Sequence, residues 1–127
     1  MFNTKDFIIE LQNTINTFTT CFYENAPDDI SEKYAVLSNL DVTKMDPEDL
    51  AFFDIDLWNK ETLNDKDNAI DIEEWCDNLR NNLNKSIIKV ENKFIARIYS
   101  EKRQNEKDND FDLIHRKLIF SAKIYNL

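Results

Sequence analysis

The sequence predicts an α+β domain in which a mostly antiparallel sheet packs in two layers against two helices, in the order α-β-β-α-β-β. Two segments carry apolar residues at helical spacing, and four carry the alternation or the short apolar runs of strands. A sheet with an apolar face and two one-sided helices can bury that surface as two layers. The length of 127 residues is that of a single domain, so we expect one domain over residues 1–127.

The first expected element is a helix over residues 4–24. Its apolar residues follow one another at spacings of four, four, three and four, which places them on one helix face. They are Phe7, Leu11, Ile15, Phe18 and Phe22. Pro27 ends the helix, because a proline pushes the residue before it out of the helical region.

Two strands are expected next, over residues 33–40 and 51–58. The first is apolar on both faces. In the second, apolar residues alternate with Asp54 and Asp56, which gives a half-buried strand with an acidic face, and Trp58 ends the strand on that same face. A polar link joins the two strands, so we expect them to form an antiparallel pair.

The second half of the chain predicts one more helix and a large hairpin. Apolar residues recur at spacings of three, four, three and four over residues 68–84, which is typical of a helix. Residues 86–99 alternate as a strand with a break near Asn92. Residues 101–112 are a charged loop, which we expect to be mobile and exposed, and residues 113–126 form the last strand.

The composition argues against most enzymes. Glycine is absent from the chain, which excludes a phosphate-binding Walker loop, a dinucleotide fingerprint and a nucleophile elbow. His115 is the one histidine, so a His-rich metal site is excluded. We therefore expect a protein without catalytic activity, cofactor or metal. Two short patterns remain as weaker candidates: Asp54-x-Asp56 could hold Mg²⁺, and Glu91-Asn92-Lys93 resembles half of a metal-dependent nuclease site.

The cysteines and the hydropathy indicate the compartment. Cys21 and Cys76 form no CxxC pair and lie within apolar stripes, so we interpret both as small core residues in a reducing compartment. No apolar run approaches the ~20 residues that span a bilayer, so we expect no membrane contact and synthesis in a cytoplasm. Sixteen asparagines, with many lysines and isoleucines, indicate an AT-rich genome.

The charge is unevenly distributed along the chain. The net charge is −9, with 13 acids and 3 bases in residues 41–77 but 6 acids and 11 bases in residues 78–127. A negative protein is not attracted to DNA phosphates. An acidic middle and a basic end could instead pair between copies of the chain, acid against base.

Large aromatic residues and charges on exposed faces are the best candidates for an interface. Trp58 lies on the acidic strand face, and Trp75 lies beside the apolar stripe of the second helix. Packing at the edge of the core is the simpler interpretation of both tryptophans. The candidate interface residues are Asp54, Asp56, Trp58, Trp75, Arg103, Lys107, His115, Arg116 and Lys117.

The order of these patterns resembles the tail terminator, or tail-completion, proteins of long-tailed bacteriophages. The resemblance lies in the first strand at 33–37 (Lys-Tyr-Ala-Val-Leu) and in a second strand at 53–58 that ends Ile-Asp-Leu-Trp. It continues in the helix at 72–79 (Ile-Glu-Glu-Trp-Cys-Asp-Asn-Leu) and in the closing strand at 116–120 and 124–125. Relatives usually place glycines in the connecting loops, which this chain does not.

The resemblance covers residues 4–127 and implies a structural virion protein of the tail–neck region, assembled in the host cytoplasm. It would form a homohexameric ring on the last ring of tail tube protein, stop tube growth and offer a surface to the head–tail connector or neck proteins. DNA would pass through the ring without specific binding, and we expect Asp54 and Asp56, or the 41–49 loop, near that channel. The 101–112 loop is the expected contact with tube or neck.

Three alternatives remain open, one of which is a metal-dependent nuclease that uses Glu91 and Lys93. The chain could be another neck component, such as a head-closure or head–tail joining protein. It could also be an acidic inhibitor that mimics DNA and blocks a host protein, although the basic end of the chain argues against that.

Overall fold

The computed structural model describes residues 2–26, 33–45, 47–60, 67–106 and 113–127. This part of the chain forms two helices and six strands. In chain order they are α1 (Thr4–Asn16), β1 (Cys21–Tyr23), β2 (Tyr34–Thr43), β3 (Asp49–Lys60), α2 (Asp67–Leu83), β4 (Ile87–Val90), β5 (Phe94–Glu106) and β6 (Leu113–Asn126). The α+β class is confirmed, but the order is α-β-β-β-α-β-β-β instead of the expected α-β-β-α-β-β.

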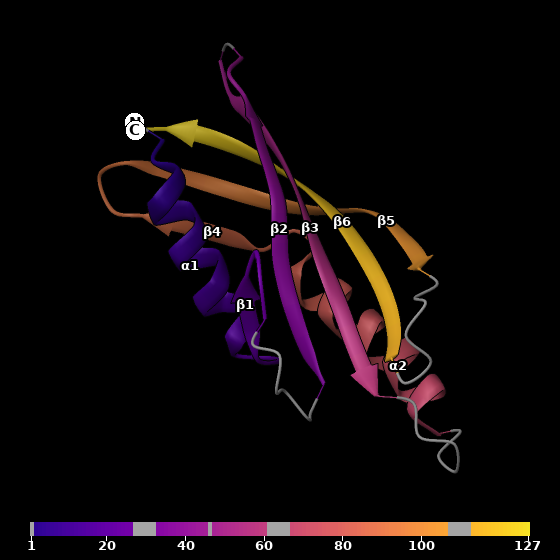
Figure 1. Cartoon of the computed structure of the whole chain (residues 1–127). Coiled ribbons are helices and arrows are strands. Elements are labelled where there is room, and N and C mark those ends of the chain that lie inside the picture. The colour runs from indigo at the N-terminus through magenta and orange to yellow at the C-terminus, as the bar shows by residue number, and fades with distance from the viewer. Residues whose placement is uncertain (1, 27–32, 46, 61–66, 107–112) are drawn as a thin grey trace.

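The six strands form one mixed sheet that curls into a half-barrel (Figure 1). The strand order is β1-β2-β3-β6-β5-β4, with β1 parallel to β2 and all other pairs antiparallel. The expected hairpins are both confirmed, since β2 pairs with β3 and β5 pairs with β6. Helix α1 contacts β1 and β4, the strands at the two ends of this order, so the helix lies between the two edges of the curled sheet.

The first helix is shorter than expected. It ends at Asn16, and the segment expected to continue it as far as residue 24 turns into β1. Three threonines follow the end of the helix, at positions 17, 19 and 20. Their β-branched side chains lower helix propensity. The side-chain oxygen of Asn16 accepts a hydrogen bond from the backbone N–H of Cys21 at 2.9 Å, which fixes the turn.

This early end changes the place of two phenylalanines. Phe18 was expected on the buried face of the first helix, but it is 45% exposed. Phe22 lies in β1, opposite Val36 of β2, and not on a helix. The predicted apolar stripe is therefore correct only for the three residues inside α1, which are fully buried: Phe7, Leu11 and Ile15.

The second half of the chain agrees better with the expectation. The expected break in the strand is a turn over residues 91–93, where Asn92 has a φ of 61°. The last strand has the expected bounds. The prediction of a charged loop, however, is wrong for its first half, because residues 101–106 continue β5, and those from Lys102 onward pair with β6. Residues 107–112 lie outside the described residues.

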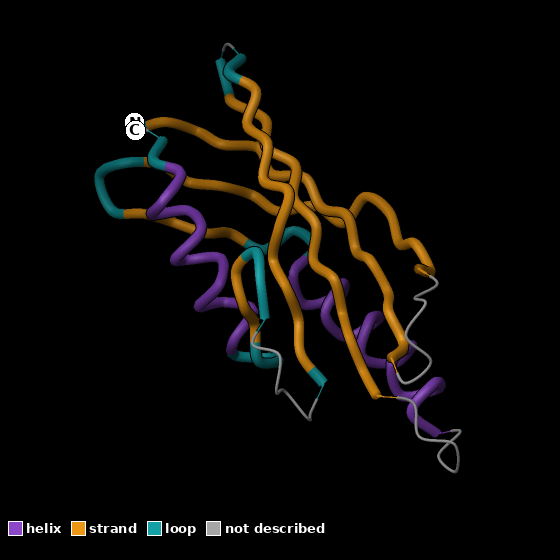
Figure 2. The backbone as a smooth tube through the Cα atoms, viewed as in Figure 1, coloured by secondary structure: helices purple, strands orange, loops and turns teal. Residues whose placement is uncertain are grey.

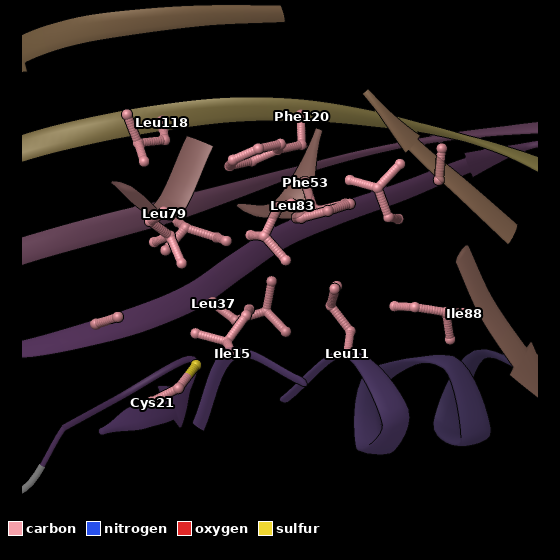
Figure 3. Packing of buried hydrophobic residues seen from close by; sticks show 14 of the residues in the cluster. Leu11, Ile15, Cys21, Leu37, Phe53, Leu79, Leu83, Ile88, Leu118 and Phe120 are labelled. Atoms are coloured by element: carbon pink, nitrogen blue, oxygen red, sulfur yellow. The ribbon is translucent and has the colours of Figure 1, made fainter. Parts of the chain in front are cut away.

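One hydrophobic core fills the concave side of the sheet (Figure 3). It joins α1, α2 and the inward side chains of the strands. The rings of Phe53 and Phe120 stack at its centre, 5.5 Å apart, and both are fully buried. Each such side chain contributes roughly 1.5–3 kcal/mol by burial. Cys21 and Cys76 are buried in the same core, as expected.

The ends of the described chain lie together at one end of the molecule (Figure 2). The backbone N–H of Phe2 donates to the side chain of Asn126, and the N–H of Leu127 donates to the carbonyl of Lys93. Within the described residues, neither helix is long and apolar enough to cross a membrane.

Because α2 and the core occupy the concave side, alternate strand residues project to the opposite, convex side. We call this convex side the outer face of the sheet. In the ranges that the structure describes, no helix covers it (Figure 1). The outer face is the surface on which most of the candidate interface residues are found.

Candidate functional site

Five of the nine candidate interface residues meet on the outer face. Asp54, Asp56 and Trp58 project from β3, and His115 and Lys117 project from the neighbouring β6. The register brings them together, since Trp58 lies opposite His115 and Asp56 lies opposite Lys117. Residues that are about sixty positions apart in the sequence therefore form one surface cluster.

The centre of this cluster is a hydrogen-bonded pair under an aromatic ring. Nε2 of His115 lies 2.6 Å from Oδ1 of Asp56, and each of the two side chains is only 13% exposed. The indole of Trp58 stacks on the imidazole, with ring centroids 3.8 Å apart and planes 13° apart. The stack and the hydrogen bond together hold the imidazole in one orientation.

Asp54 also has partners. Its carboxylate accepts a hydrogen bond from the side-chain amide of Asn39 at 2.7 Å and lies 4.0 Å from Nζ of Lys117. Asn39 adopts a φ of 55° at the bulge of β2, which turns its side chain toward β3. The acidic strand face, which was expected to be exposed to solvent, is half-buried, and its two carboxylates both have partners. Asp54 and Asp56 accordingly offer less negative potential for repelling DNA than the sequence alone indicates.

Aromatic rings continue from this cluster across the outer face. Phe22 of β1 packs edge-on against Tyr34 of β2 at 6.1 Å, and Tyr34 lies parallel to Trp58 at 6.5 Å. With His115, these rings form a row over four strands, which we call the aromatic ladder. The sequence does not point to Phe22 or Tyr34 as interface residues, because the helical spacing places Phe22 on a helix and the strand of Tyr34 is apolar on both faces.

Two other candidates point to the opposite side of the sheet. Arg103 of β5 and Arg116 of β6 face α2, and both pair with the carboxylate of Glu73. Nε of Arg116 donates to Glu73 Oε1 at 2.8 Å. Burial, and then the positive charge of Arg116, lower the pKa of Arg103. Asp77 lies 3.9 Å from Arg103 at the edge of this group. These arginines join α2 to the sheet.

The last two candidates are placed differently again. Trp75 belongs to the hydrophobic core and is 7% exposed, which agrees with the simpler interpretation, packing at the core edge. Its indole Nε1 is buried without a hydrogen-bond partner among the described residues. Lys107 lies outside the described residues.

The two patterns considered for metal chemistry, Asp54-x-Asp56 and Glu91-Asn92-Lys93, do not form a metal site among the described residues. Glu91 and Lys93 lie in the turn between β4 and β5, and Lys93 pairs with Asp6 of α1, so the strand placement required by the nuclease hypothesis is wrong. In the described ranges, no three His, Cys, Asp or Glu side chains gather as a metal site. Burial raises the pKa of both Cys21 and Cys76 to about 11, which keeps the thiols protonated and poorly nucleophilic.

Comparison with known proteins gives no further assignment. No protein-family model matches the chain, and no curated protein sequence matches it.

Proposed function

We propose that this protein is a structural component of a long-tailed bacteriophage virion that assembles as a ring, closes the tail tube and forms the joint to the head. The observation that carries the proposal is the outer face. Over the described residues it is an uncovered sheet surface with a four-strand aromatic ladder and charged groups of both signs. Rigid aromatic rings with a polar surround are typical of protein interfaces.

The ionisable groups of the outer face support binding more than catalysis. Asp56 and His115 are bonded to each other, and Asp54 is held between Asn39 and Lys117. A general base must instead have a free lone pair within reach of a substrate proton. The bond from Asp56 holds the imidazole of His115, on which Trp58 stacks, and a ring that is already fixed loses less entropy when a partner binds.

A ring suits the way in which charge is distributed over the molecule. In a ring each copy contacts the next through two different surfaces. On the helix side Asp71 and Glu74 are exposed, whereas Arg97 and Lys123 are exposed on the outer face, so these surfaces of neighbouring copies can attract each other. The same basic residues disfavour the DNA-mimic alternative, which requires acids along one uninterrupted face.

The experiment that tests the proposal removes the gene from a phage that encodes it and examines the particles by electron microscopy. Tails of excess length without heads support the role of tail terminator. Free tails of normal length with unfilled heads assign the protein to another neck component. Intact infectious virions would show that it has no role in tail or neck assembly.

A further inference from the structure

The solvent side of α2 carries an acidic groove. Asp71, Glu74, Asn78 and Asn82 follow one another along one face of the helix at spacings of three and four residues. Together with the end of α1 they line a groove of about 490 Å³. Asp71 and Glu74 are exposed and take part in no ion pair within the described part of the chain.

Two further features indicate that the groove is incomplete in the single chain. Trp75 lines the groove, and its indole N–H is buried without an acceptor among the described residues. An orphaned buried donor costs roughly 1–3 kcal/mol. Phe18 also lines the groove and is 45% exposed. Lys33 is the one cation among the described residues of the lining, and its ammonium group lies 5.3 Å from the centre of the Trp75 ring.

The outer face, on the opposite side of the molecule, carries a basic patch away from the aromatic ladder. Arg97 of β5 and Lys123 of β6 lie directly opposite each other in the register, and both are exposed. Like charges in that position repel each other. The structure gives neither an ion pair with any described residue. An acidic partner would remove this repulsion.

A hollow lies beside the two cations. Ser121 is a small residue in one row between two aromatic residues, since it pairs with Phe52 on one side and with Tyr99 on the other. Phe52 is 43% exposed. The hollow has a volume of about 510 Å³ and Lys123 borders it, with its ammonium group 5.7 Å from the centre of the Tyr99 ring. Glu101 also lines the hollow, and its carboxylate accepts a hydrogen bond from the hydroxyl of Ser121. Lys123 and Arg97 are the cations at this surface that have no ion pair among the described residues.

We propose that the acidic groove of one copy docks on the basic patch of the next copy, with Asp71 and Glu74 facing Arg97 and Lys123. The inference rests on the proposed ring-forming function and names the contact between its copies. The two surfaces carry opposite charges without ion pairs among the described residues, two carboxylates on the groove and two cations on the patch, and each surface also has an exposed aromatic residue, Phe18 or Phe52. Because the two surfaces lie on opposite sides of the molecule, the contact is heterologous and continues from copy to copy until it closes.

The test uses two charge-reversal variants. The groove variant carries Asp71→Lys and Glu74→Lys, and the patch variant carries Arg97→Glu and Lys123→Glu. A control variant with Lys5→Glu and Glu10→Lys changes exposed charges of α1 that belong to neither surface. Circular dichroism checks that all three fold. Sedimentation velocity then measures self-association of each protein, and of a mixture of groove and patch variants, in about 0.01 M salt, where charges act over roughly 30 Å.

We expect the wild type and the control to associate, and each reversal variant alone to associate at least about tenfold more weakly. The equimolar mixture should recover wild-type association, because the reversed groove then meets the reversed patch. A mixture that stays monomeric overturns the inference, and so does a wild type that stays monomeric. A groove variant that associates like the wild type also overturns it and indicates a contact between two outer faces.

The outcome is separable from that of the proposed function. Overlong tails in the gene deletion, together with failure of the mixture to associate, would leave the tail-terminator proposal standing and remove only this contact. Normal virions in the deletion, together with recovery in the mixture, would keep the contact and remove the phage assignment.

Discussion

Glu73 joins α2 to the sheet, and its replacement by glutamine tests whether Arg103 and Arg116 are structural. The substitution keeps the shape of the side chain but removes the charge that both arginines share. The arginine side chains are 20% and 18% exposed, whereas that of Glu73 is 39% exposed, so water screens part of the interaction. A fully buried pair would lose roughly 3–5 kcal/mol when broken. After allowance for the screening we expect Glu73→Gln to lower the free energy of unfolding by about 1–3 kcal/mol.

The assay is thermal unfolding followed by circular dichroism. For a chain of this length 1 kcal/mol corresponds to roughly 4 °C in the midpoint, so we expect the midpoint to fall by about 4–12 °C. The matched control is Glu10→Gln, the same substitution on the exposed side of α1, at a residue that belongs to neither proposed contact surface and has no ion pair within the described residues. We expect that control to stay within about 0.5 kcal/mol of the wild type.

Salt gives a second readout of the same interaction. In about 1 M salt the Debye length falls to roughly 3 Å, so the difference between the unfolding midpoints of the two variants should become smaller. Equal midpoints for Glu73→Gln and Glu10→Gln in low salt would refute the reasoning. The two arginines would then be free to serve as interface residues, as the sequence suggested.

Three other predictions concern the thiols, the tryptophans and one turn. Because the pKa of Cys21 and of Cys76 is raised from 9.0 to about 11, we expect thiol reagents at pH 8 to label the folded protein only as fast as it opens. The raised pKa values contribute to the free energy of unfolding in full below pH 9. As the pH rises from 9 to 11 that contribution should be lost, by up to about 3 kcal/mol per thiol. Urea titrations measure the loss, and a free energy of unfolding that does not change over this range would contradict the burial of the thiols. Trp75→Ala should lower the free energy of unfolding by about 3–5 kcal/mol, because Trp75 is in the core. Trp58→Ala on the outer face should lower it by about 1 kcal/mol and keep the fold. Equal losses of stability in the two variants would contradict this difference in burial. Lys85, just after α2, has a φ of 66°, a backbone conformation that glycine adopts without a steric penalty. Lys85→Gly should therefore raise the free energy of unfolding by up to about 1 kcal/mol. A lower free energy of unfolding would show that contacts of the lysine side chain outweigh the backbone effect.

The parts of the fold that could be predicted are those with a long and regular local pattern. Helix α2 and strand β6 have such patterns, and their bounds agree with the expectation to within about one residue. The short strand β1 could not be predicted, because three residues become a strand only through parallel pairing with β2, and that pairing depends on residues more than ten positions away.

Strand β5 shows a different limit of the sequence. Residues 101–106 are polar, which is typical of a loop, yet they form a strand because β6 supplies a partner from Lys102 to Glu106. Glu73 of α2 also gives Arg103 an ion pair on the inner side. Local propensity does not depend on β6 or on Glu73, which are distant in the sequence. The local sequence therefore predicted a loop where the structure has a strand.

For the candidate site, the sequence identified the chemistry but not the arrangement. The alternation in β3 correctly placed Asp54 and Asp56 away from the core, and it placed Trp58 beside them. The approach of His115 and Lys117 depends on the register between β3 and β6, which the sequence does not contain. The same register creates the basic patch, which no linear pattern indicated.

The central claim is that the outer face is a contact surface in the assembled tail. The most direct test measures tail length by electron microscopy in a phage that lacks the gene and receives it from a plasmid, either as wild type or as the double variant Trp58→Ala and Phe52→Ala. Both residues lie on the outer face, and the variant is first shown to fold. The account predicts normal tails with the wild-type gene and overlong, headless tails with the variant. Normal, head-joined tails made with the folded variant would contradict it.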